Sequence, residues 1–290
     1  MLTQEPDTLP AVRGATSART RAPGVRLDSR GSIIFAAVVL TFVIGGAAAS
    51  LLIPQFDPLR ADFTAAMQPP SPAHWFGTDA TGRDVFARTM AGGLSSLIVA
   101  ALTLAVGLVA GSFIGIIAGY FGRVIDEIVG TVIDLMLALP GLILIMVVVS
   151  LVGSNYWTIG LLIGVLTIPV FARIARSATL SVREREFVHA AWLLGASRAR
   201  IMTREIARTV LPSVLAYSFT AITAAIVAEG SLSFLGYGLQ PPTPSWGSLI
   251  AEGRTHLAGA PWIMLAPALV MCLTVLAVNI LGERFTRKDV

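Results

Sequence analysis

Long apolar runs separated by short polar segments make up most of the chain. Six of these runs come close to, or exceed, the roughly 20 residues that a helix needs to cross a bilayer. They cover residues 32–54, 94–120, 128–152, 157–172, 211–235 and 261–281. The first run is longer than the apolar core of a signal peptide, so we interpret it as a retained membrane helix. The pattern predicts an all-α polytopic membrane protein with six transmembrane helices.

The polar segments between the runs set the expected organisation. A polar tail, residues 1–31, is expected to be a disordered extension. It precedes the first transmembrane helix, 32–54, and a loop over 55–93. A five-helix core follows over 94–282, and residues 283–290 form a short C-terminal tail.

The basic residues predict the orientation of the chain. Of the 21 basic residues, all except Lys288 are arginines. With six spans, both termini lie on one side of the membrane, and the segments on that side carry 17 of the 21. Because positively charged loops stay in the cytoplasm, both termini and the segment 173–210 are predicted to be cytoplasmic. The loops 55–93 and 236–260 then face outward.

Composition and single residues exclude several kinds of chemistry. Hydrophobic residues make up 55% of the chain and charged residues 13%, with a mean hydropathy of +0.78, which excludes an ordinary soluble enzyme. Arginines in loops between spans do not indicate nucleic-acid binding. Lys288 has no glycines in register for a Walker A loop, so the chain is not an ATPase by itself. His74, His189 and His256 fall on different sides of the membrane and Cys272 is the only cysteine, so no metal site is expected. No catalytic residue is predicted either, since no nucleophile motif occurs.

Two of the runs carry signals for helix packing. Gly107, Gly111, Gly115 and Gly119 recur every four residues and make a stripe that another helix can approach closely. The neighbour is either a helix of this chain or one of a partner. Pro140 interrupts the third run and predicts a bend whose freed backbone groups face protein or a water-filled path.

The cytoplasmic segment 173–210 has an internal helical pattern. Apolar spacing predicts one helix over 182–194 and another over 198–210. Between them, Gly195 suits the left-handed position that follows a helix. Ser197 suits the N-cap of the next helix. The segment is therefore expected to be two helices joined by a sharp turn.

The first of these helices has an apolar face. It is formed by Phe187, Ala190, Ala191 and Leu194. An arginine-rich amphipathic helix binds a membrane surface. Alternatively, small central residues let such a helix dock in a groove of a partner protein. The periodicity alone leaves both alternatives open.

Four separated motifs resemble the permeases of binding-protein-dependent ABC importers. The stretch FVHAAWLLGAS, starting at Phe187, is similar to the EAA loop of that family, which here spans 174–212. The motifs at 74–93, 229–253 and 273–285 are similar to the C-type subunit of oligopeptide and dipeptide permeases. The resemblance covers roughly residues 33–285.

The chain departs from the pattern of that family at two places in the loop. His189 stands where the loop usually has glutamate. Ala207 and Arg208 stand where a Leu-Pro pair is usual, which favours a second loop helix that runs on towards Leu211.

The resemblance implies a set of partners and functional residues. It implies a bacterial inner-membrane complex with a homologous second permease subunit, cytoplasmic ATPase subunits and an extracytoplasmic solute-binding protein, surrounded by membrane lipids. The chain then has no cofactor of its own, because ATP and Mg²⁺ are bound by the ATPase subunits. The residues implied to couple to the ATPases are Phe187, Val188, His189, Ala190, Ala191, Leu194, Gly195, Ala196, Ser197 and Arg204.

Two acidic residues within the spans need partners. Glu229 either contacts a substrate or cation, or braces the structure through Ser231, Ser233 or nearby backbone. We favour the bracing role. Asp134, near the cytoplasmic end of the third span, is expected to face an arginine or water.

The outward segment after the fifth span is rich in proline. Pro241 and Pro242 predict a stiff, extended loop, and Trp246 suits an anchor at the membrane interface. The resemblance implies that this loop forms part of the surface facing the binding protein. The two roles are compatible.

The function expected from the resemblance is import of oligopeptides or dipeptides by alternating access. Permeases for nickel, haem or glutathione share the scaffold and remain alternatives. An ion-coupled secondary transporter would need several ionisable groups at mid-membrane and inverted repeats. An intramembrane enzyme would need a catalytic motif. The sequence shows neither set of features.

Overall fold

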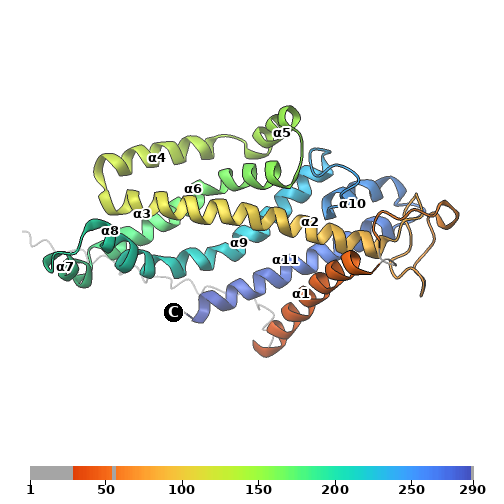
Figure 1. Ribbon diagram of the computed structural model, residues 1–290, viewed down its shortest axis with the longest axis horizontal. Helices are drawn as coiled ribbons and strands as arrows, with labels where there is room; N and C mark the ends of the chain where they lie inside the picture. Colours follow the sequence, from red (N-terminus) through yellow and green to blue (C-terminus); the bar gives the residue numbers. More distant parts are fainter. Residues whose placement is uncertain (1–28, 54–56, 289–290) are drawn as a thin grey trace, which may run out of the picture.

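A computed structural model describes residues 29–53 and 57–288 (Figure 1). The predicted tail 1–31 lies outside these residues except for its last three. The helices are α1 (Ser29–Leu52), α2 (Val85–Val106), α3 (Ser112–Phe121), α4 (Arg123–Ala138), α5 (Gly141–Val152), α6 (Tyr156–Arg183), α7 (Glu186–Leu193), α8 (Arg198–Arg200), α9 (Ala207–Phe234), α10 (Trp246–Gly253) and α11 (Trp262–Lys288). Short 3₁₀ turns, η2 (Phe63–Ala65) and η5 (Arg254–His256), and π turns, η3 (Gly107–Gly111) and η4 (Ile201–Ile206), complete them.

Within the described residues, five helical stretches are long and apolar enough to cross a membrane. They are Gly31–Ser50, Val85–Phe121, Tyr156–Arg183, Arg198–Phe234 and Trp262–Phe285. The pair α4 and α5 is bent by 78° and adds a sixth span if it is counted as one. The predicted all-helical, polytopic class is therefore confirmed.

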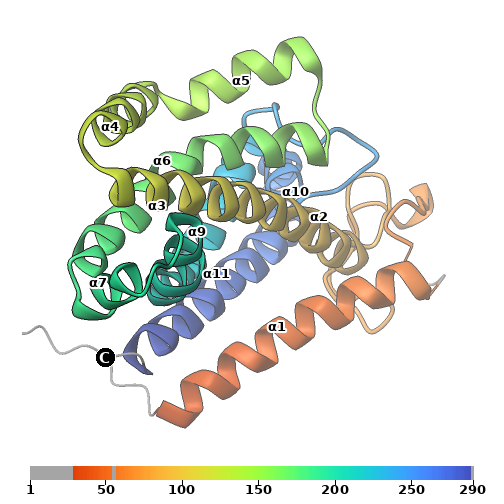
Figure 2. The ribbon, with the colours of Figure 1, turned by 60° about the vertical axis from the view of Figure 1, so that its left-hand side comes forward.

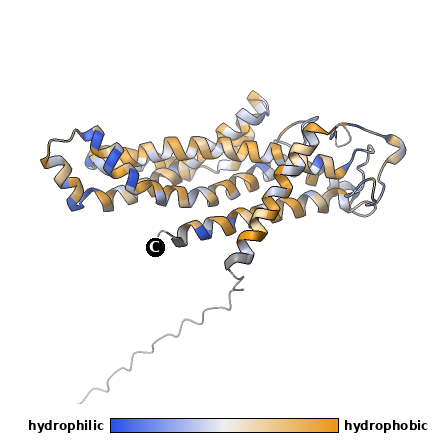
Figure 3. Cartoon of the chain, turned by 60° about the horizontal axis from the view of Figure 1, so that its bottom comes forward, coloured by the Kyte–Doolittle hydropathy of each residue, from blue (hydrophilic) through white to orange (hydrophobic). Residues whose placement is uncertain are grey.

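The long helices run side by side in an elongated bundle. Helix α1 lies along one flank, against α2 and α11, whereas the bent pair α4–α5 lies on the opposite flank, over α3 and α6 (Figures 1 and 2). Helix α7 lies at one end of the bundle and α10 towards the other, and we call these the α7 end and the α10 end. Apolar residues cover the length of the helices, and hydrophilic residues gather towards the two ends (Figure 3).

The second span begins earlier than the sequence predicts. Helix α2 starts at Val85, so the last nine residues of the expected loop 55–93 are helical. The Asp84 side chain caps the helix by accepting the N–H of Ala87 at 2.9 Å. The charged residue Arg88 lowers the local hydropathy, so the apolar run predicts a later start for this helix. In the structure, ion pairs with Asp79 and Glu252 neutralise the charge of Arg88 within the protein.

Other predicted boundaries also differ. Helix α6 continues to Arg183, well past the expected end of the fourth span at 172, so the helix expected over 182–194 begins only at Glu186, as α7. Helix α11 continues to Lys288, into the expected tail 283–290. The expected loop 236–260 contains α10, whose capping box is formed by Ser245 and Ser248. The expected helix 198–210 is not separate, because it is continuous with α9 through the π turn η4. This fits the replacement of the family's usual Leu-Pro pair by Ala207 and Arg208.

Candidate functional site

The turn after α7 has the geometry that the sequence predicts. Gly195 follows the helix with a φ of +78°, the left-handed conformation that glycine adopts without a penalty. Its N–H bonds to the carbonyl of Trp192, and that of Ala196 bonds to the carbonyl of Ala191. The Ser197 hydroxyl then accepts the N–H of Arg200 at 3.3 Å and caps α8.

The inner face of this helix–turn unit differs from the predicted apolar face. Val188 is buried, and Ala191 and Ala196 are partly buried. Together they pack against a core cluster that includes Ile201 and Ile206. These contacts fix the unit on the bundle. Phe187, Ala190 and Leu194, which the periodicity placed on one face with Ala191, are exposed instead.

Large apolar side chains form the outward tip of α7. The tip consists of Trp192, Leu193 and Leu194, which are 65%, 77% and 88% exposed. The sequence prediction included only Leu194. The sequence did contain a signal for Trp192 and Leu193. Three consecutive large apolar residues just before a glycine turn cannot all face the same core. An exposed apolar tip on a fixed support is typical of a protein docking site.

Two polar residues expected on this surface are also exposed. His189 lies on α7, with Nδ1 3.3 Å from the carbonyl oxygen of Arg185. Arg204 lies on η4. Both are accessible to a partner at the α7 end.

The glycine stripe packs against a helix of this same chain. A Cβ at Gly111 would lie 2.8 Å from the carbonyl oxygen of Ile168, and one at Gly115 would lie 2.3 Å from that of Ala172. Gly107 and Gly119 face α6 in the same way. Of the two neighbours that the sequence left open, the structure selects α6. Only two residues connect α6 to α7, which carries the exposed tip. By packing against α6, the glycine stripe therefore fixes the helix from which α7 extends.

Helix α4 of the bent pair meets α6 across a polar cavity of about 500 Å³. Pro140 lies at the break, as predicted. Arg173 Nη2 lies 2.9 Å from Asp134 Oδ1, which confirms the expected arginine partner. Asp126, about two turns before Asp134 on α4, forms a two-pronged ion pair with Arg176. Gly130, between the two aspartates, has no atom close to where its Cβ would lie. Two charge pairs beside an open cavity, together with the buried Ile133, therefore link this part of α4 to α6.

A buried polar cluster lies around Glu229, which is fully buried in α9. Its two carboxylate oxygens accept hydrogen bonds of 2.7 Å from Ser96 on α2 and Ser233 on α9. Ser245, the N-cap of α10, donates to Ser233 at 3.1 Å. The carboxylate thus joins α2, α9 and the start of α10. This geometry fits the bracing role, although Ser96, which lies far away in the sequence, was not predicted as a partner.

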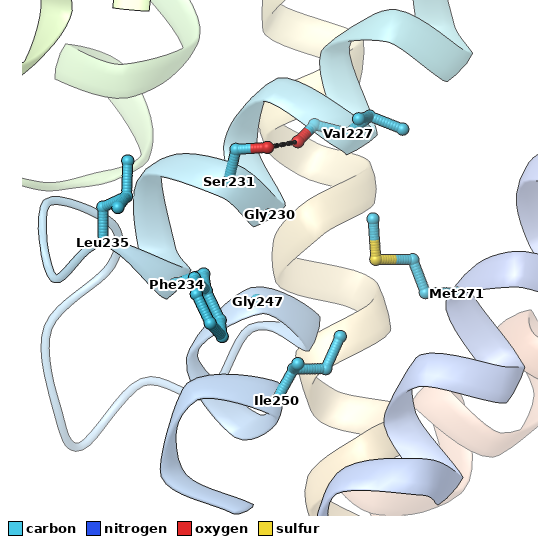
Figure 4. Close-up of a pocket in the computed structure, with 8 residues that line it drawn as sticks. All are labelled: Val227, Gly230, Ser231, Phe234, Leu235, Gly247, Ile250 and Met271. Carbon is cyan, nitrogen blue, oxygen red and sulfur yellow. Dashed lines mark hydrogen bonds between the residues drawn. The ribbon is translucent and has the colours of Figure 1, made fainter. Parts of the chain in front are cut away.

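Ser231, the other serine considered, bonds within its own helix. It donates to the Val227 carbonyl at 2.8 Å and faces an apolar pocket of about 390 Å³ (Figure 4). The pocket lies between α9, α10 and α11, with Phe234, Ile250 and Met271 among its walls (Figure 4).

Trp246 is not the interfacial anchor that the sequence predicts. It is fully buried, and its indole lies against Gly93 of α2, where an added Cβ would lie 2.7 Å from the ring. Its Nε1–H donates to the Thr89 carbonyl at 3.0 Å. The glycine in α2 makes room for the ring, so Trp246 holds α10 in the bundle and does not face a binding protein.

The proline loop keeps its predicted exposure but not its predicted extended shape. Pro241 and Pro242 are exposed, are joined by a cis peptide bond and form a turn. They lie beside the α10 end of the bundle.

A second charged cluster at the α10 end was not predicted. Arg88 pairs with Asp79 and, through two bonds of 3.0 and 2.9 Å, with Glu252 of α10. Burial alone would raise the pKa of Asp79. Hydrogen bonds from Thr81 and from the Arg83 backbone, together with the Arg88 guanidinium, lower that pKa below its usual value. The cluster fastens the loop 57–84 to α2 and α10.

These features define a class. Membrane-spanning helices carry an exposed apolar tip at one end and a cross-braced polar cap at the other, and no group of three or more potential metal ligands occurs in the described residues. This is the architecture of a multi-pass helical membrane protein.

Comparison with known proteins gives the family. Residues 111–288 match the family described as binding-protein-dependent transport system inner membrane component, and the chain belongs to this family. It is an ABC importer permease and not itself an ATPase.

The names of the relatives mention substrates, as two of them illustrate. A protein of Brucella suis biovar 1 (strain 1330), provisionally named a peptide permease, is 36% identical over 275 residues, which are 94% of this chain and 91% of the relative. The glutathione transport system permease protein GsiD of Escherichia coli O1:K1 / APEC is 36% identical over 214 residues, 74% of this chain and 71% of that protein.

Proposed function

We propose that this permease imports short peptides as one of two homologous permease subunits that enclose a central path. The observation that carries the substrate class is the similarity over 94% of the chain to a relative named as a peptide permease. The relative named as a glutathione permease supports glutathione, itself a small peptide, as the second candidate. Nickel and haem have no such support among these relatives.

The proposed energy source is ATP hydrolysis by separate cytoplasmic subunits, which hold the ATP and Mg²⁺. The apolar tip 192–194 on its fixed support is the proposed contact with these subunits. Helix α6 carries the resulting motion from α7 along the bundle to the bent pair α4–α5, where Pro140 is a proposed lining residue of the path. The path then opens alternately to the two sides of the membrane.

A solute-binding protein is the proposed source of substrate at the α10 end. The support is the family's dependence on such proteins and the polar, braced cap formed by the loop 57–84, the proline turn and α10.

Uptake by the reconstituted complex tests the proposed substrate. Proteoliposomes should contain the permease together with the second permease subunit, the ATPase subunits and the binding protein of its proposed complex. We expect ATP-dependent accumulation of labelled di- to pentapeptides, and accumulation of glutathione under the same conditions identifies the second candidate. Uptake of neither, with ATP hydrolysis intact, would contradict the proposal.

Cysteine labelling tests the proposed orientation. In a Cys272→Ser background, Ser197→Cys places a thiol at the α7 end and Pro242→Cys places one at the α10 end, both at exposed positions. The distribution of basic residues predicts that an impermeant maleimide labels Pro242→Cys in intact cells and Ser197→Cys only after permeabilisation. The reverse pattern would invert the orientation and remove the basis for ATPase docking at α7.

A further inference from the structure

A second, smaller polar cavity of about 330 Å³ lies at the α10 end. Its walls come from the start of α2, the proline turn and α10, and its lining residues are Arg83, Arg88, Pro241, Pro242, Thr243, Ser248 and Glu252. The proline turn and Arg83 lie outside the helices that span the membrane. The exposed pair Pro241–Pro242 forms part of its wall at the surface.

The two arginines of this cavity differ in their pairing. Arg88 is neutralised by Asp79 and Glu252. Arg83 makes no salt bridge within the described part of the chain, and its Nε is buried without a hydrogen-bond acceptor. A buried, unpaired guanidinium nitrogen is costly, so an acceptor from outside the chain would stabilise it.

The backbone of Arg83 is nevertheless fixed. Its N–H donates to Asp79 Oδ1 at 3.0 Å, and its carbonyl accepts the Asp79 N–H at 2.9 Å. Asp79 is itself held by Arg88 and Thr81. Asp79 therefore fixes the backbone of Arg83 beside the cavity, while the Arg83 guanidinium has no anionic partner among the described residues.

We propose that this cavity is a carboxylate-binding site, and that an Asp or Glu side chain on the surface of the solute-binding protein fills it during docking. The guanidinium fork of Arg83 matches a carboxylate in geometry and charge. Arg83 and the proline turn lie outside the spans, at the surface that a protein arriving from the α10 side would meet first. Thr243 provides a hydroxyl at the same cavity. The Ser248 hydroxyl is already used, because it donates to the Ser245 carbonyl at 3.0 Å. This inference rests on the proposed role of a binding protein.

The test is docking of the purified, peptide-loaded binding protein to the complete transporter in phosphatidylcholine nanodiscs, which carry no net lipid charge. We expect Arg83→Gln to weaken the affinity about tenfold at low salt, because one charge-assisted contact is lost. The loss should shrink at high salt. Arg83→Lys keeps the charge but not the fork and should fall in between. Arg60→Gln removes the same charge at an exposed position of the same loop that lies outside the cavity, so it is the matched control and should weaken docking clearly less than Arg83→Gln.

Different failures have different meanings. If the unmodified transporter does not bind the binding protein, the proposed function fails before this site is reached. Normal docking by Arg83→Gln would overturn the proposed site for a carboxylate of the binding protein. If Arg83→Gln docked normally but had a raised KM for peptide, the carboxylate that Arg83 binds would belong to the substrate, and the proposal would also be overturned. Arg83 makes no side-chain bond within the described chain, so the thermal unfolding midpoint of Arg83→Gln should match that of Arg60→Gln. A fall in that midpoint together with a docking loss that salt does not reduce would make Arg83 structural and overturn the proposal.

Discussion

Leu194→Asp is expected to abolish peptide uptake while leaving the permease folded. Leu194 is 88% exposed at the tip of α7, so the substitution removes little packing within the described chain. If the tip seats in an apolar cleft of an ATPase subunit, the variant buries an unpaired carboxylate there. An unpaired charge at such a contact costs more than 3 kcal/mol, which corresponds to a loss of affinity of about a hundredfold or more. Co-purification of the ATPase subunits and ATP-driven uptake measure the effect.

The structure favours Leu194 over two neighbouring positions for this test. Gly195 has a φ of +78°, so Gly195→Asp would strain the turn as well as add a charge. Ala191 packs against the core cluster, so Ala191→Asp would unfold the unit. Either substitution would lose uptake for reasons unrelated to docking.

His189→Glu is the matched control on the same helix. It adds a negative charge at an exposed position and restores the residue that is usual in this loop, so ATPase association and uptake should persist. Normal uptake by Leu194→Asp would exclude the tip as the ATPase contact. Loss of uptake by both variants would show that any negative charge on α7 is harmful, and would leave the tip without a specific role.

Glu229→Leu is expected to reduce the yield of assembled complex, whereas Glu229→Gln should keep most of the yield and most of the uptake. Leucine would leave the hydroxyls of Ser96 and Ser233 without their acceptor in a buried site, at a cost of about 1–3 kcal/mol for an unsatisfied group. Glutamine still accepts one of these bonds, and its amide can donate to the other serine after the hydroxyl rotates.

A direct substrate contact predicts the opposite result for glutamine. If the charge of Glu229 received a peptide amino group or a cation, Glu229→Gln would assemble normally and fail to transport. Measuring complex yield and uptake for both variants separates the two roles. Ser231→Ala is the control, because that hydroxyl bonds only to the backbone of its own helix and should be dispensable for assembly.

The sequence alone determined the elements whose signals are local. Apolar runs longer than the bilayer core allow few structures other than membrane helices, so the all-helical, polytopic class followed from hydropathy. The turn after α7 also followed, because the left-handed backbone and the N-cap each depend on one residue, Gly195 and Ser197. Pro140 marked the break between α4 and α5 for the same reason, since proline cannot complete a regular helix.

Only the tertiary structure decided the features that join distant segments. Glu229 meets Ser96, and Arg88 meets Glu252, across more than a hundred residues, and no local pattern encodes such pairs. The glycine stripe could not name its neighbour, because small residues permit close approach without specifying to which helix. Trp246 was misplaced for a related reason. Its amphipathic ring suits an interface as well as a core, and the space above Gly93, which arises only when α2 and α10 pack together, determined that it lies in the core.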